Sequence, residues 1–465
     1  MKLHDTITAI ATPIGSGGIA ILRISGTDAE SIAQKIVQTK NKKPLCALES
    51  HKLTLSDIHL LGDPSVLIDE ALVAVMRAPH SYTGEDVVEI NCHGGFLAAD
   101  RILEQLIKAG ARLAEAGEFT RRAFINGKTD LTGAEATMDI IQSHSGLGLQ
   151  NAAGTAAGKL AKKINGLRDE ILAIAAHISA ATDYPDEVDE PASGQVYNTL
   201  AGILQDMQQL IDGFSTGRIL KDGIHTVIVG KPNVGKSSVL NALARAERAI
   251  VTDIPGTTRD VIEEYIQIRG ASLRLLDTAG IRENADAVEQ IGIARAKENM
   301  QKADLCLFVI DVSEGISKED IAIAKELDGK EIILILNKTD KAGEISLTEA
   351  EKYLGIPKED IVKTATPKDA PPIGIEQLEE RIAQKFLTGK FTPGEVYITG
   401  QRQKDSLCKG ADSIRRAMDS AGNAMPYDLL FIDLEDAAAA LGEITGETVQ
   451  EEIIEQVFSR FCVGK

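Results

Sequence analysis

The chain has 465 residues, of which 43% are hydrophobic, and its formal net charge is −19. This length predicts roughly two to four domains, and no apolar run approaches the ~18 residues that a membrane span needs. The acidic balance argues against nucleic-acid binding over the whole surface, and five scattered cysteines without a C-x-x-C pair favour reduced thiols in a cytoplasm.

Residues 1–122 read as a mixed α/β domain. Short, β-branched apolar runs predict its strands, and helical periodicity behind an acidic start predicts a helix over 28–38. The predicted strands lie in ITAIATP, GIAILRISG, DEALVAVMRAP and DVVEINCHGG.

A helical region follows in two pieces. Residues 123–221 place apolar side chains at three- and four-residue spacing, with an acidic, proline-bearing loop at 183–190 between two helices. Residues 388–465 turn helical again. Between these pieces, residues 222–387 alternate helices with short continuous apolar runs, which are typical of buried parallel strands. The sequence therefore predicts an α/β domain inserted into an all-helical domain.

The strongest motif is GKPNVGKSS at 230–238, which fits the phosphate-loop pattern G-x-x-x-x-G-K-[ST]. Gly230 and Gly235 let backbone N–H groups point at phosphates. Lys236 would reach the β and γ phosphates, and the Ser237 hydroxyl would ligate Mg²⁺. An apolar run precedes the motif and a helical run follows it, as the strand–loop–helix unit requires.

Two further motifs end apolar runs of the same region. Asp277 in DTAG (277–280) places a carboxylate to reach Mg²⁺ directly or through water, and Gly280 can turn its N–H toward the γ-phosphate. Asp340 in NKTD (337–340) would accept hydrogen bonds from the N1–H and the amine of guanine, an edge that adenine does not present.

The segment TAT at 364–366 stands where such proteins often carry Ser-Ala-Lys beside the base, and Thr366 departs from that pattern. In this order at strand ends, the motifs predict GTP binding. The expected GTP contacts are Asn233, Val234, Gly235, Lys236, Ser237, Ser238, Thr252, Asp253, Ile254, Pro255, Gly256, Thr257, Thr258, Asp277, Thr278, Ala279, Gly280, Asn337, Lys338, Thr339, Asp340, Thr364, Ala365 and Thr366.

Hydrolysis also needs a group that orients the attacking water. Many small GTPases carry a glutamine directly after DTAG, but this chain has Ile281. The next polar groups are Arg282, Glu283 and Glu289. A carboxylate among them could reach the water through a second water; the alternative is that all three are surface charges on a switch helix.

Hydrolysis also needs a positive group that stabilises the negative charge of the transition state. The side-chain oxygen of Asn233, with backbone carbonyls of the 252–257 loop, could hold a monovalent cation that acts much as an arginine finger does. Thr257 or Thr258 could complete the Mg²⁺ shell through its hydroxyl.

Several stretches of the chain resemble the tRNA-modifying GTPase family called MnmE, also TrmE. The resemblance covers essentially the whole length. It is carried by DTITAIATPIGSGGIAILRISG, SYTGEDVVEINCHGG, GEFTRRAFINGKTDLTGAEA, DIPGTTRD, DTAGIREN and FCVGK. It implies an α/β folate-binding and dimerisation domain (1–122), a helical domain in two parts (123–221 and 388–465) and an inserted P-loop GTPase domain (222–387).

The resemblance also implies an activity. The family hydrolyses GTP in a K⁺-dependent way and, with the flavoprotein MnmG, adds a carboxymethylaminomethyl or aminomethyl group to C5 of the wobble uridine of certain tRNAs. A reduced folate, 5-formyl- or 5,10-methylene-tetrahydrofolate, supplies the carbon. Expected here are a cytoplasmic homodimer, a heterotetramer with MnmG, tRNA as substrate and no membrane partner.

Matched motif by motif, the resemblance assigns roles to single residues. It implies Glu289 as the group that orients the water and Arg282 as a switch arginine that helps to place it. The implied K⁺ ligands are Asn233, Thr252, Ile254 and Thr257, and the implied Mg²⁺ ligands are Ser237 and Thr258. The implied folate-binding residues are Arg23, Glu89, Lys128 and Lys465.

Two other functions compete with this one. A ribosome-assembly GTPase acting as a binding switch would be expected to carry an RNA-binding appendage such as a KH domain, and the acidic tail after residue 387 contains no such pattern. A membrane-remodelling GTPase would be expected to carry a basic amphipathic helix or a lipidation box, and neither pattern is found.

Overall fold

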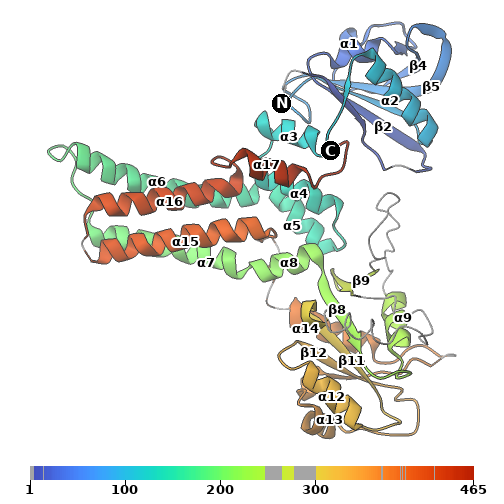
Figure 1. The fold of residues 1–465 in the computed structure, drawn as a ribbon, viewed down its shortest axis with the longest axis vertical. Helices are drawn as coiled ribbons and strands as arrows, with labels where there is room; N and C mark the ends of the chain where they lie inside the picture. Colours follow the sequence, from blue (N-terminus) through green and yellow to red (C-terminus); the bar gives the residue numbers. More distant parts are fainter. Residues whose placement is uncertain are drawn as a thin grey trace.

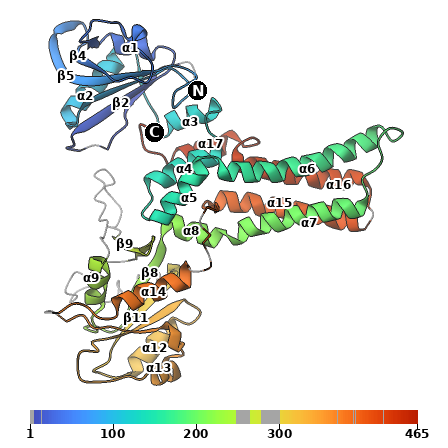
Figure 2. The same cartoon turned by 180° about the vertical axis from the view of Figure 1, so that it is seen from behind.

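A computed structural model describes residues 5–13, 15–246, 264–276, 300–367, 370–387, 389, 391–392, 394–423 and 425–465. Figure 1 shows an N-terminal sheet, an elongated array of helices and a second sheet, and Figure 2 shows the same arrangement from behind. Within the described residues, no helix is both long and apolar enough to cross a bilayer.

The N-terminal sheet has the strand order β3-β4-β5-β6-β2-β1-β7. Helices α1 and α2 cover one of its faces, and a continuous apolar core lies between sheet and helices. The opposite face carries Arg23 and part of the exposed apolar surface. The elements are β1 (Ile7–Ile10), β2 (Ile19–Ser25), α1 (Ala29–Gln34), β3 (Val37–Thr39), β4 (Thr54–Leu60), β5 (Asp63–Met76), β6 (Val87–His93), α2 (Phe96–Ala109) and β7 (Arg112–Leu113).

One predicted element is shorter than its pattern. The helix expected over 28–38 ends at Gln34, and Val37–Thr39 forms an edge strand that pairs with β4. Val37 lies opposite Ile58 in that pair. A β-branched side chain beside an open strand edge favours strand pairing, and this tertiary contact overrides the local helical periodicity.

The helical part is built from two distant pieces of the chain. Helices α6 and α7 pack with α15 and α16 around one apolar core to which both pieces contribute, for example Ile171 and Leu434. Its elements are α3 (Glu118–Ile125), α4 (Leu131–Ile141), α5 (Gly146–Ala156), α6 (Lys159–Asp183), α7 (Ser193–Asp212), α8 (Phe214–Asp222), α15 (Gln401–Gly422), α16 (Tyr427–Thr445) and α17 (Glu451–Phe458). The acidic loop predicted at 183–190 lies between α6 and α7.

The second sheet lies between these pieces in the chain, with the order β13-β12-β11-β8-β10-β9. The pairs β8–β10, β8–β11, β11–β12 and β12–β13 are parallel, as the continuous apolar runs predict, and β9 joins the edge in antiparallel fashion. Its elements are β8 (Ile224–Val229), α9 (Lys236–Ala246), β9 (Glu264–Ile268), β10 (Ala271–Leu275), β11 (Leu305–Asp311), α12 (Lys318–Glu326), β12 (Ile332–Asn337), α13 (Leu347–Leu354), β13 (Ile361–Lys363) and α14 (Ile375–Phe386).

Candidate functional site

The phosphate-loop motif connects β8 to α9. Gly230 and Gly235 have φ of +142° and +101°, which L side chains rarely adopt. A Cβ on Gly235 would lie 2.1 Å from Nδ2 of Asn337, so only glycine fits there. The ammonium of Lys236 donates to the carbonyls of Gly230 and Lys231 at 2.7 and 2.8 Å, and burial lowers its pKa. The loop is thus a tight turn with a lysine folded back over it, which suits a polyanionic ligand.

Asn337 ties the NKTD motif to two other motifs. Its Nδ2 donates to the carbonyl of Val234 at 2.9 Å, and its Oδ1 accepts from the Thr364 hydroxyl at 3.1 Å. The side chains of Asn337 and Thr364 are both fully buried. Thr339 donates through its hydroxyl to the Thr364 carbonyl at 3.1 Å. The segments 230–238, 337–340 and 364–366 therefore meet at one edge of the sheet, where parallel strands place their carboxyl ends.

Lys338 is held over this edge by two contacts. Its ammonium donates to the Asn233 carbonyl at 2.7 Å and pairs with the Asp311 carboxylate at 2.6 Å. Burial raises the pKa of Asp311, but the hydrogen bonds from Lys338 and Ser313 outweigh it and hold that pKa below its usual range. Asp340 is exposed, which leaves its carboxylate accessible to a base.

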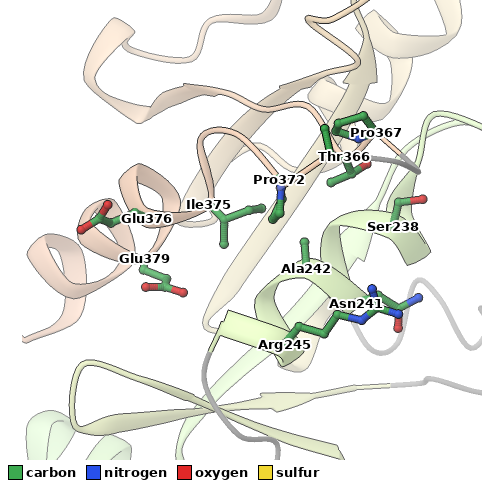
Figure 3. Close-up of a pocket in the computed structure, with 11 residues that line it drawn as sticks. Ser238, Asn241, Ala242, Arg245, Thr366, Pro367, Pro372, Ile375, Glu376 and Glu379 are labelled. Atoms are coloured by element: carbon green, nitrogen blue, oxygen red, sulfur yellow. The ribbon is translucent and has the colours of Figure 1, made fainter.

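A cleft of about 780 Å³ adjoins the phosphate-loop helix. Figure 3 shows Ser238, Asn241 and Arg245 of α9 on one side and residues between Thr366 and Glu379 on the other. Neither Lys236 nor Asp340 lines it, so the cleft borders the motifs rather than containing them.

Part of the expected nucleotide site lies outside the described residues. This applies to Thr252, Asp253, Ile254, Pro255, Gly256, Thr257, Thr258, Asp277, Thr278, Ala279, Gly280, Arg282 and Glu289. Of the expected metal ligands, Asn233 and Ser237 are described, and both are exposed.

A second constellation lies on the N-terminal sheet. Arg23 on β2 stands opposite Glu89 on β6, and its guanidinium binds that carboxylate through Nε at 2.8 Å and Nη2 at 2.7 Å. Its Cζ lies 5.1 Å from the centre of the Tyr82 ring and 5.7 Å from that of Phe119. The remaining Nη1 is buried without a hydrogen-bond partner among the described residues. A buried donor of this kind suits an acceptor on a bound ligand.

The other two expected folate residues each contact a segment that carries a neighbour of this arginine. Lys128 donates to the Pro79 carbonyl at 2.9 Å, on the segment that carries Tyr82. The carbonyl of Lys465 accepts from the backbone N–H of Phe119 at 3.2 Å. Val463 forms a bridge with Ala116, so the C-terminal residues lie against the N-terminal sheet.

Three residues of these sites were not predicted. Asp311 ends the apolar run LCLFVID, so its place at a strand end was visible in the sequence. Tyr82 and Phe119 carried no comparable signal, because their contact with Arg23 joins segments distant in sequence.

Two family models and full-length relatives all match this chain to one family. A family model for the MnmE helical domain matches residues 131–462, and one for the GTP-binding protein TrmE N-terminus matches residues 6–128. The tRNA modification GTPase MnmE of Alkaliphilus oremlandii is 42% identical over 469 residues, and that of Clostridioides difficile is 43% identical over 467 residues; each match covers 100% of both chains. Among solved structures, the FeoB G-domain of Methanococcus jannaschii is 28% identical and covers 34% of this chain and 94% of its own, with a TM-score of 0.25, too low to support a conclusion.

Proposed function

Because this chain belongs to the MnmE family of tRNA modification GTPases, we propose that it hydrolyses GTP to drive a modification of tRNA. With the flavoprotein MnmG, it adds a carboxymethylaminomethyl or aminomethyl group to C5 of the wobble uridine. A reduced folate supplies the carbon. The observation that carries the GTPase part is the Asn337 tether, which brings the phosphate loop and both base-recognition segments together.

Base selection follows from the exposed carboxylate of Asp340. A carboxylate accepts two donors from one edge of guanine, and a base without those donors leaves it unpaired. Replacing it by an amide in Asp340→Asn offers a donor and an acceptor, which suits xanthine better than guanine. Fluorescent-nucleotide titration checks this, and an unchanged preference for guanine would reject the role of Asp340.

The roles proposed for the attacking water and the cations rest on the motif resemblance to the family. Glu289 orients the attacking water with help from Arg282. Asn233, Thr252, Ile254 and Thr257 hold K⁺, and Ser237 and Thr258 hold Mg²⁺. Those ions supply positive charge beside the transferred phosphoryl group. Glu289→Ala lowers turnover while GTP affinity stays near normal, and equal turnover in Na⁺ and K⁺ would contradict the K⁺ site.

The folate site is proposed at Arg23, where the unpartnered Nη1 supports it. Nη1 of Arg23 would donate to an acceptor of the bound folate, and the ammonium of Lys128 would meet its anionic glutamate tail. Glu89 would accept from the pterin amine while it orients Arg23. Lys465 lies beside Phe119, which packs under the same guanidinium.

A homodimer through the N-terminal domains is supported by the uncovered face of the sheet. Leu55 and Leu72 lie opposite each other on β4 and β5, and their side chains are 44% and 40% exposed. Neighbouring apolar residues that face water on a sheet are typical of an interface.

The test combines cells with purified protein. Nucleoside mass spectrometry of tRNA from cells that lack this chain is expected to show loss of the C5 modification on wobble uridine. Lys236→Ala is expected not to restore it, whereas Lys318→Ala, an exposed lysine of α12, restores it fully. An unaltered modification profile would favour the ribosome-assembly function instead.

A further inference from the structure

The hairpin of β9 and β10 occupies a special place in the chain. Its strands pair in antiparallel fashion, and its turn lies at Arg269 and Gly270. The segment expected to hold K⁺ and Mg²⁺ precedes β9, and β10 runs directly into the DTAG motif at 277–280. In the chain, one short hairpin thus joins two segments whose motifs, in nucleotide switches, are of the kind ordered by the γ-phosphate.

The turn of this hairpin contacts the junction between α4 and α5. The backbone N–H of Leu147 donates to the Gly270 carbonyl at 3.1 Å. Gly270 has φ of +93°, and a Cβ there would lie 3.3 Å from Cγ of Leu147. The ring of His144 stacks on that of Tyr265 in β9, with centroids 3.8 Å apart and planes 17° apart. The two contacts hold the hairpin at both its turn and its outer strand, and Figures 1 and 2 both show β9 beside α5.

Helix α4 also binds the two points where the chain enters and leaves the inserted sheet. Lys221, at the end of α8 before β8, pairs with the Asp139 carboxylate at 2.9 Å. Thr399, just before α15, donates its hydroxyl to the same carboxylate at 2.8 Å. Asp139 is one turn from the junction, so both connections bind the C-terminal half of α4, next to the junction that contacts the hairpin.

The other end of α4 leads to the proposed folate site. Asp130 caps this end by accepting from the Gly133 N–H, and Lys128 lies two residues before the cap. Helix α3, which carries Phe119 under Arg23, packs against α4. Since α4 has 11 residues, it spans about 16 Å between the α4–α5 junction and the cap that follows Lys128.

We propose that the α4–α5 junction couples the nucleotide state of the inserted domain to the N-terminal folate site, with His144 and Leu147 as the positioning residues. This proposal rests on the proposed function for the identity of both sites. The hairpin changes position with the nucleotide, the stacked rings and the Leu147 bond carry that displacement to α4, and α4 shifts α3 and Lys128.

The test uses the full-length protein with MnmG, tRNA, GTP, K⁺ and methylene-tetrahydrofolate. In His144→Ala, the yield of modified uridine per GTP hydrolysed is expected to fall about tenfold, the size of a typical coupling between sites. The KM for GTP and the melting temperature stay near wild type, because His144 is only half-buried and lies outside the nucleotide site. His144→Phe keeps a stacking ring and restores the yield. Leu149→Ala, at an exposed leucine of α5 close to His144 in the chain, is the matched control.

Amide hydrogen exchange tests the coupling without the modification reaction. Replacing GDP by GDP–aluminium fluoride in wild type is expected to change exchange at residues 230–238, 144–150 and 118–128. In His144→Ala the change persists at 230–238 and is lost at 118–128. Equal changes in both proteins, a yield that His144→Phe does not restore, or an equal loss of yield in Leu149→Ala would overturn the coupling. A wild type that binds nucleotide but forms no modified uridine would instead overturn the proposed function, while the exchange result still decides the coupling.

Discussion

At the scale of single residues, buried polar side chains with several partners hold the candidate nucleotide site together. Asn337 satisfies a carbonyl of the phosphate loop and a hydroxyl of the segment at 364–366 through one amide. At the surface of the site, the ammonium of Lys338 donates hydrogen bonds to the Asn233 carbonyl and to the Asp311 carboxylate. Because each buried group has a partner, removing one side chain leaves others unsatisfied, which is costly in a dry interior.

Asn337→Ala is expected to lower the free energy of unfolding of the inserted domain by about 1–3 kcal/mol. It is also expected to weaken GTP binding about tenfold or more, because the loop loses the hydrogen bond from Asn337 to the Val234 carbonyl that holds it in place. Denaturant unfolding and fluorescent-nucleotide titration measure the two effects. The exposed Asn41 provides the control, Asn41→Ala, and an affinity equal to that control would refute the tether.

The cysteines are expected to differ in reactivity. Burial raises the pKa of Cys92, with a contribution from Asp69, to about 11, and burial raises that of Cys306 to about 11. The thiols of Cys46 and Cys462 are exposed. Brief iodoacetamide treatment of the native protein at pH 8 should therefore label Cys46 and Cys462 but not Cys92 or Cys306. Peptide mass spectrometry reads this out, and rapid labelling of Cys306 would show that β11 opens readily.

At the scale of elements, α3 depends on an ion network at its core-facing side. Glu118 is fully buried and binds Arg112 at 2.7 Å and Arg122 at 2.9 Å. Arg122 is also buried and further binds Asp5 and Glu85. Charged residues such as Glu118 and Arg122 are mostly exposed in proteins, so the local sequence gives no sign that they are buried. Only contacts from distant strands make them interior groups.

This network predicts a pH dependence. Burial raises the pKa of Glu118. Hydrogen bonds from Arg112, the Glu115 N–H and Arg122 lower it by more than burial raises it, so the pKa lies below 4.5. The pKa of Asp5 lies below 3.8, because bonds from Arg112 and Arg122 outweigh burial. Stability from these depressed pKa values is fully present above the unfolded-state values and is lost as the pH falls through the folded-state values. The melting temperature should be level above about pH 5 and drop below pH 4.5.

Glu118→Gln should remove much of that slope and cost about 3 kcal/mol, because the charge of Arg122 stays buried with fewer partners. Glu115→Gln, at an exposed neighbour, is the control. Calorimetric scans between pH 3 and pH 7 compare the three proteins. An unchanged pH slope in Glu118→Gln would show that other carboxyl groups govern acid unfolding.

At the scale of the whole molecule, a helical part lies between the two sheets. Its helices come from the chain before and after the inserted sheet. The C-terminal residues reach back to the start of α3, just after the N-terminal sheet, where the Lys465 carbonyl accepts from the N–H of Phe119. The first and last parts of the chain therefore stabilise each other, and the proposed folate site is complete only when both are folded. The open face of the same sheet carries Leu55 and Leu72, which places the proposed dimer contact beside that site.

Leu72→Glu is expected to convert the protein into a monomer, because a charge at the centre of an apolar contact must be desolvated for association. Light scattering after size exclusion measures the mass. Leu97→Glu places the same charge at an exposed position on α2, which covers the opposite face of the sheet, and should leave the dimer intact. A Leu72→Glu dimer of normal stability would move the proposed interface elsewhere.

The sequence by itself determined the family, the multidomain α/β and all-α fold class and the nucleotide motifs. These depend on short-range patterns: runs of buried parallel strand, helical periodicity, and glycines whose spacing a phosphate loop requires. The assigned ligand roles and the domain boundaries stay predictions. The tertiary structure decided what distant segments do together: the tether of Asn337, the ring contacts of Arg23, the edge strand at 37–39 and the docking of His144 on Tyr265. No local pattern encodes these contacts, because their energy comes from partners tens or hundreds of residues away that meet only after the chain has folded.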